Sequence, residues 1–226
     1  EAFLPAPWKA SDVAQGVIVI GLVGLAAVLF TLIARPTLGL DPDWVALVAT
    51  ALLGVAMVLV AWRLGPGRYR LPISHLGLRL PRGRSKALLP WLVLLASLAF
   101  TNLSLSLVNL AGIQGLLPPP LPPALGLEHG GRVAGFLLAV VWGPFSEEVF
   151  FRGFVLPGLW GRLGFVGAAG ASSLLFGLAH GVPGVMIPAF VTGLLLAWLY
   201  RRTRSIWSCT LAHSAQNGIA FAIGLR

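Results

Sequence analysis

The sequence predicts an all-α, polytopic membrane protein: a single-domain bundle of about seven transmembrane helices. Hydrophobic residues make up 57% of the 226 positions and charged residues 10%, and the mean hydropathy is +0.88. A soluble domain carries about 25% charged residues, so composition places this chain among membrane proteins. The apolar residues are also gathered into runs close to the ~20 residues that one helix needs to cross a bilayer.

Seven such runs are expected to span the membrane: residues 13–34, 44–62, 88–112, 133 to about 152, 164–182, 184–200 and 206–225. The first run is longer than the core of a signal peptide, so we interpret it as a span. Segment 113–132 contains five prolines and is expected to be a loop, and 153–163 is expected to connect two spans. Within the single membrane domain 1–226, residues 13–132 supply N-terminal spans and loops, and 133–225 supply the core.

Positive charges predict the orientation in the membrane, because cytoplasmic loops are enriched in Lys and Arg. Segment 63–86 carries seven basic residues and no acidic one. If it lies in the cytoplasm, alternation of seven spans leaves only Arg35, Arg132 and Arg226 on the other side. The sequence therefore predicts an integral protein of a cytoplasmic membrane with a cytoplasmic N-terminus.

Composition also bounds partners and source. The net charge of +9 is explained by membrane orientation, so we expect a lipid bilayer as partner and no nucleic acid. With Cys209 as its one cysteine, the chain has no internal disulfide. Two lysines against fourteen arginines, together with much Ala, Gly and Leu, indicate a GC-rich prokaryote.

The segment Ser146–Gly153 concentrates charge at the end of an apolar run. It holds two of the seven acidic residues of the chain, Glu147 and Glu148, together with Arg152. In a helix, Glu148 and Arg152 share a face and form an ion pair, whereas Glu147 is rotated by about 100°. A charge within a membrane span costs roughly 2.5–3.5 kcal/mol, so intramembrane carboxylates indicate function. The alternative is a structural ion pair that fixes helix packing.

Two histidines lie in later apolar runs, each paired at helical spacing: Phe176 with His180, and His213 with Asn217. Residues four apart share a helix face. A lone membrane histidine is more often a packing residue, but two histidines and two carboxylates in three spans favour one common site between the fourth, fifth and seventh helices.

Such a set of groups supports hydrolysis in two ways. A carboxylate in a low-dielectric cavity takes a proton from water while imidazole or amide groups stabilise the oxyanion. Alternatively, Glu147, His180 and His213 hold Zn²⁺ with an open position. The sequence has no His-Glu-x-x-His, no Gly-x-Ser-x-Gly and no intramembrane Asp pair, so the thermolysin-like, serine-nucleophile and presenilin-like sites are not expected.

In this order, Glu-Glu-x-x-x-Arg at 147–152, Phe-x-x-x-His at 176–180 and His-x-x-x-Asn at 213–217 resemble the CPBP (CAAX-processing and bacteriocin-processing, or Abi) family of intramembrane proteases. The resemblance covers about residues 133–220, and Leu76–Arg79 resembles the family weakly. It implies that Glu147 activates water, that Glu148 and Arg152 support the site, and that His180, His213 and Asn217 bind metal or stabilise the oxyanion. Phe176 is expected to contact the substrate.

The expected function is therefore an intramembrane endopeptidase that cleaves a membrane-associated peptide or protein. The alternatives are a non-catalytic immunity or scaffold protein of the same family and a proton-coupled carrier. The family's eukaryotic members trim prenylated C-termini, and bacterial ones are expected to cut other membrane-anchored peptides or bacteriocin leaders. The depth of His180 in the membrane relative to Glu147 stays open. If a span begins at residue 164, His180 lies about 24 Å along the helix from that residue, away from Glu147.

Overall fold

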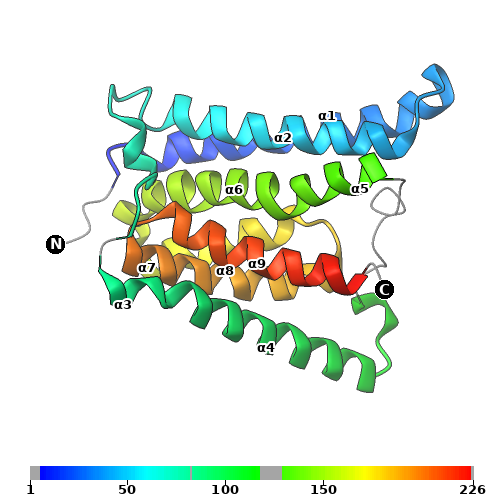
Figure 1. The fold of residues 1–226 in the computed structure, drawn as a ribbon. Coiled ribbons are helices and arrows are strands. Elements are labelled where there is room, and N and C mark those ends of the chain that lie inside the picture. The colour runs from blue at the N-terminus through cyan, green and yellow to red at the C-terminus, as the bar shows by residue number, and fades with distance from the viewer. Residues whose placement is uncertain (1–5, 82, 118–128, 225–226) are drawn as a thin grey trace.

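The computed structural model describes residues 6–81, 83–117 and 129–224, and over these ranges the chain forms helices and no strands (Figure 1). The all-α class is therefore confirmed. The long helices lie side by side as a bundle: α1 (Ala10–Leu38), α2 (Pro42–Leu64), α4 (Leu89–Leu110), α7 (Leu156–Ala179), α8 (Pro183–Thr203) and α9 (Ile206–Gly224). Three short helices lie in the connections before and after α4: η1 (Ile73–Leu76), α3 (Arg84–Ala87) and η2 (Gln114–Leu116).

The helix that carries the two carboxylates contains two π-helical segments. It begins as α5 (His129–Phe136), continues as the π-helix η4 (Leu137–Trp142) and α6 (Gly143–Glu148), and ends as a second π-helix, η5 (Val149–Val155). Its packing against α2 is close: a Cβ on Gly54 would lie 2.4 Å from Trp142 Nε1, and that indole N–H donates to Ala51 O at 3.0 Å. Wide helical turns of this kind occur often at functional sites.

This helix runs on into α7 and then folds back on itself. The apolar helical run Gly131–Ala179 has 49 residues, about 74 Å of helix, and a bilayer core is about 30 Å thick. Gly164 interrupts it with φ 66° and ψ 175°, a conformation that glycine adopts at little cost. Beyond the break, Ser172 Oγ donates to Phe151 O at 3.0 Å, although 21 residues of straight helix would separate them by about 31 Å. The run therefore supplies two antiparallel legs.

The predicted count of seven spans is not confirmed. By length and composition, five helical runs among the described residues are able to cross a membrane: Ala10–Ile33, Asp43–Leu64, Leu89–Leu110, Gly131–Ala179 and Pro183–Thr203. The fourth of these contains both the fourth and the fifth span expected from the sequence. The nineteen-residue α9, which corresponds to the seventh, lies outside this set.

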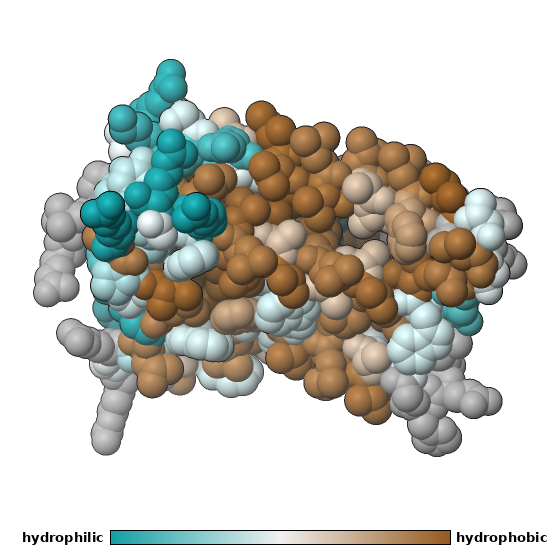
Figure 2. All heavy atoms as spheres, turned by 90° about the horizontal axis from the view of Figure 1, so that it is seen from above, coloured by the Kyte–Doolittle hydropathy of each residue, from teal (hydrophilic) through white to brown (hydrophobic). Residues whose placement is uncertain are grey.

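The basic segments meet at one end of the bundle. Arg79 Nε donates to Arg204 O at 2.9 Å, and Arg68 forms an ion pair with Asp12 of α1 at 2.9 Å. At the same end Trp8 Nε1 donates to Phe154 O at 2.9 Å. Figure 2 shows the hydrophilic side chains gathered at this end and an apolar surface over the rest of the face. The expected placement of segments 63–86 and 201–204 on one side of the membrane agrees with this arrangement.

Segment Leu76–Arg79 joins the ends of three helices. Ile206, the first residue of α9, donates its N–H to Gly77 O at 2.9 Å. Gly77 has φ +84°, and a Cβ there would lie 2.7 Å from the ring of Tyr200 in α8. A Cβ on Gly153 of η5 would lie 2.7 Å from Leu76 O. This loop therefore holds η5, α8 and α9 together at their basic ends.

Candidate active site

The two adjacent carboxylates have different environments, as their rotation around the helix predicts. The side chain of Glu147 is 29% exposed, whereas that of Glu148 is fully buried. Glu148 Oε1 accepts from Arg152 Nη1 at 2.9 Å, so the predicted i, i+4 ion pair is present. The buried carboxylate is thus engaged within the protein, and Glu147 is the one that other molecules reach.

Arg152 is almost completely buried, with its side chain 1% exposed. Besides Glu148, its guanidinium donates from Nη2 to Gly193 O of α8 at 3.3 Å and lies over the ring of Phe176, 4.3 Å from the centroid. A Cβ on Gly193 would lie 2.9 Å from Ser173 Cβ, so α8 approaches α7 closely here. A buried charge needs partners of this kind, because an isolated ion in the protein interior is very costly.

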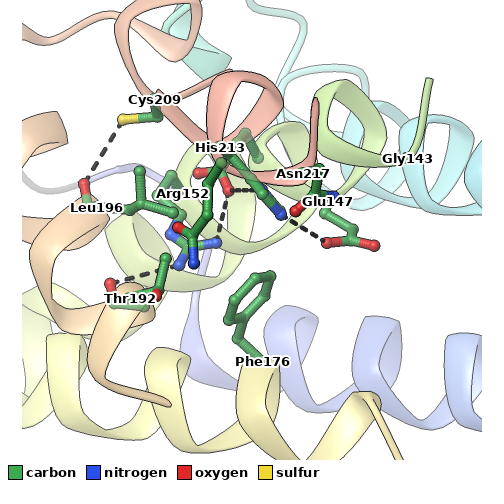
Figure 3. A network of polar contacts seen from close by, with 12 residues as sticks. Gly143, Glu147, Arg152, Phe176, Thr192, Leu196, Cys209, His213 and Asn217 are labelled. Carbon is green, nitrogen blue, oxygen red and sulfur yellow. Dashed lines mark hydrogen bonds and ion pairs between the residues drawn. The ribbon is translucent and has the colours of Figure 1, made fainter. Parts of the chain in front are cut away.

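His213 of α9 lies between the two carboxylates (Figure 3). Its Nδ1 is 3.0 Å from Glu148 Oε1, and its Nε2 is 3.8 Å from Glu147 Oε2. The ion-paired Glu148 carboxylate only accepts, so the hydrogen bond places a proton on Nδ1 and orients the ring. The distance to Glu147 is too long for a direct hydrogen bond.

The ring of Phe176 in α7 connects the two histidines. Its centroid is 4.9 Å from that of His180 and 5.6 Å from that of His213, both edge-to-face. His180 Nδ1 also hydrogen-bonds to Phe176 O at 2.8 Å, which turns the imidazole back by one helical turn. Phe176 thus contacts the rings of both histidines, and the depth of His180 relative to Glu147 stays a prediction. Phe176 itself is 1% exposed, so its expected contact with substrate stays a prediction.

Asn217 follows His213 by one turn of α9, so the two side chains share a face of that helix. Its Nδ2 donates to Ala139 O of the π-helix η4 at 2.9 Å. The amide has a second N–H, which this contact leaves available for another acceptor. The structure therefore brings side chains from α6, η5, α7 and α9 into one region: Glu147, Glu148, Arg152, Phe176, His180, His213 and Asn217.

The donor groups of this region do not form a three-ligand zinc site. Over the described residues, no three His, Cys, Asp or Glu side chains are grouped so that they could hold one metal ion. Glu148 and Nδ1 of His213 are already bonded to each other. Glu147, His180 and His213 are therefore not grouped as a three-ligand site in this structure, and zinc dependence stays a prediction.

Sequence reasoning missed a second polar group beside the site. Ser97 Oγ of α4 donates to Gln216 Oε1 at 2.7 Å and lies 2.6 Å from Thr192 Oγ1 of α8, and both Ser97 and Thr192 are buried. These hydrogen bonds connect α4, α8 and α9. Thr192 directly precedes Gly193, and Gln216 directly precedes Asn217. The available signal was a polar residue within each of three apolar runs, but the sequence does not show which of the many Ser and Thr residues meet.

Comparison with known proteins finds similarity to membrane peptidases over the segment that carries these residues. Residues 129–219 match the family model described as type II CAAX prenyl endopeptidase Rce1-like. The candidate membrane peptidase YdiL of Bacillus subtilis is 31% identical over 81 residues, which cover 36% of this chain and 33% of that protein. The chain thus matches only about a third of the length of this relative. No solved structure is significantly similar to the chain.

All seven predicted site residues lie within the matched segment, and the helices that contain them meet in one polar region inside an apolar bundle. The CAAX-processing resemblance inferred from three short motifs is therefore confirmed: residues 129–219 match the Rce1-like family of membrane peptidases.

Proposed function

We propose that this chain is an intramembrane endopeptidase in which Glu147 activates the attacking water. The observation that carries the proposal is the asymmetry of the two carboxylates. Glu148 is buried and bonded to both Arg152 and His213, whereas Glu147 is partly exposed and 3.8 Å from the nearest imidazole nitrogen. A water molecule beside this pair can donate one O–H to Glu147 while it also forms a hydrogen bond with His213, which is the arrangement a general base needs.

In the proposed reaction Glu147 takes a proton from water as the water oxygen bonds to the carbonyl carbon of the scissile peptide. The carbonyl π electrons move to the oxygen, and the free N–H of Asn217 donates to that oxyanion. His180 Nδ1 is bonded to Phe176 O, so its Nε2 donates to the oxyanion when the ring is an imidazolium. The C–N bond then breaks, and Glu147 returns the proton to the leaving amine.

Glu148 and Arg152 hold this arrangement in place rather than touching the substrate. Arg152 neutralises Glu148, and Glu148 fixes the orientation of His213. No step in this scheme needs a metal ion. The substrate is a peptide or protein that reaches the site within the membrane, since the long helices are apolar enough to cross a bilayer and the face seen in Figure 2 is largely apolar.

The test compares membrane fractions of cells that produce the full chain, its Glu147→Gln variant or neither protein. Mass spectrometry of peptide termini should find new ends only with the unchanged chain. A synthetic peptide that spans such an end then gives kcat and KM for the purified protein, and Glu147→Gln should lower kcat by at least ~10²-fold, the scale of a general base.

Equal termini in all three samples would reject the protease assignment. The scaffold alternative predicts a different result, in which the unchanged chain and Glu147→Gln retain the same bound peptide and neither cuts it. Circular dichroism and the unfolding midpoint of the two purified proteins show whether a loss of cleavage reflects chemistry or folding.

A further inference from the structure

We infer that Pro144 is a positioning residue for Asn217, and that it acts through the carbonyl group of Ala139. The inference rests on the proposed function only where it concerns the rate of cleavage. The positioning itself follows from the hydrogen bonds of η4 and α6, and a spectroscopic measurement tests it without any substrate.

The first step concerns the register of the backbone. In an α-helix, Gly143 N–H would donate to Ala139 O, four residues earlier. In the structure it donates to Leu138 O, five residues earlier, as a π-helix requires. Gly143 suits this turn, because a Cβ at that position would lie 2.8 Å from the same Leu138 O.

The second step concerns the donor that is missing. In a π register the partner of Ala139 O is the N–H of residue 144, five residues later. Residue 144 is proline and has no N–H. Its ring also clashes with the carbonyl of residue 140 in a regular α-helix, which disfavours the α register. The carbonyl of Ala139 therefore has no backbone donor from either register.

The third step concerns the group that donates to Ala139 O instead of a backbone N–H. Asn217 Nδ2, from α9, donates to Ala139 O at 2.9 Å. A carbonyl group within an apolar bundle that lacks a hydrogen-bond partner is destabilising, so the amide of Asn217 is held strongly at this position. One N–H of Asn217 is thereby fixed, and because the amide group is planar, the direction of its second N–H is fixed with it.

Replacement of Pro144 by a residue with a backbone N–H should weaken the hydrogen bond from Asn217 to Ala139 O. Pro144→Ala allows either residue 144 to donate to Ala139 O in the π register or Gly143 to do so in the α register. In both cases a backbone donor competes with Asn217. Because proline is unfavourable inside a helix, the variant should be as stable as the original protein or more stable.

The chain offers a clean spectroscopic readout, since it contains only three asparagines: Asn102, Asn109 and Asn217. The full chain, labelled with ¹⁵N-asparagine and placed in lipid nanodiscs, gives three side-chain amide pairs, and Asn217→Ser identifies the third. Pro144→Ala and Pro144→Leu should both shift the Asn217 pair. Pro188→Ala, which removes a proline from the interior of α8, is the matched control and should leave it unchanged.

In an assay with a synthetic peptide that the protein cleaves, Pro144→Ala should lower kcat by about 10- to 10²-fold and leave KM unchanged. A misplaced oxyanion donor lowers the rate on this scale. Its unfolding midpoint should not fall. An unshifted Asn217 signal in both Pro144 variants would overturn the inference, as would full kcat in Pro144→Ala. A shifted signal in a protein that cleaves nothing would instead contradict the protease proposal and leave the positioning of Asn217 supported.

Discussion

Glu148 and His213, 65 residues apart in the chain, meet at 3.0 Å between Oε1 and Nδ1, and the same Oε1 accepts from Arg152 at 2.9 Å. One buried oxygen atom thus joins the guanidinium of η5 to the imidazole of α9. The neighbouring Glu147 faces the opposite nitrogen of that imidazole, Nε2. The geometry separates a carboxylate that orients from a carboxylate that is available to react, and this separation can be measured.

The two conservative amide substitutions should therefore differ. Glu147→Gln removes a partly exposed base and should lower kcat while the unfolding free energy stays within about 0.5 kcal/mol of the original. Glu148→Gln removes the charge that faces Arg152 and His213, and it should lower both kcat and stability, since it leaves a buried cation without its partner. Cleavage assays and denaturant titrations of the same samples distinguish the two. A loss of stability in Glu147→Gln equal to that in Glu148→Gln would contradict the assignment.

Arg152→Ala should destabilise the protein by roughly 3–5 kcal/mol, because it removes the arginine that neutralises the buried Glu148. The double variant Glu148→Gln with Arg152→Met removes both charges and should be less destabilised than Arg152→Ala alone. Arg63→Ala, which removes an exposed arginine at the end of α2, is the matched control and should change stability by less than about 0.5 kcal/mol. Unfolding in mixed detergent measures all three, and equal values for Arg152→Ala and Arg63→Ala would show that the pair contributes nothing.

Metal content tests the proposed chemistry directly. The purified protein should contain no stoichiometric zinc, and a chelator should leave its cleavage rate unchanged. His180→Ala and Asn217→Ala should each still lower the rate by about 10²–10³-fold, as lost oxyanion donors do. One equivalent of zinc per chain, with activity lost in the chelator and regained with zinc, would replace the scheme by a metal-dependent one.

The orientation in the membrane is testable with single cysteines on a Cys209→Ser background, since Cys209 is buried. Ser74→Cys in the basic loop and Gln114→Cys in η2 are both at exposed positions. An impermeant thiol reagent should label Gln114→Cys in intact cells and Ser74→Cys only after the membrane is opened. The reverse pattern would place the basic end outside and would invert the predicted topology.

The sequence by itself determined the class of fold and predicted which side chains would lie close together. Apolar runs of bilayer length leave few alternatives to membrane helices, because backbone groups in lipid must be bonded within the segment. The pairing of Glu148 with Arg152 also follows from local geometry, since residues four apart share a face in any helix. The same spacing placed His180 beside Phe176.

Only the tertiary structure decided how those helices meet. The reversal at Gly164 brings Ser172 to Phe151, and a glycine in an apolar run does not by itself reveal where a helix turns back. Which of the two glutamates is buried depended on the positions of α8 and α9. The bond from Asn217 to Ala139 likewise joins two residues 78 positions apart, and the sequence does not show that they meet. Contacts between distant segments depend on how side chains pack together, and spacing along one helix does not contain that information.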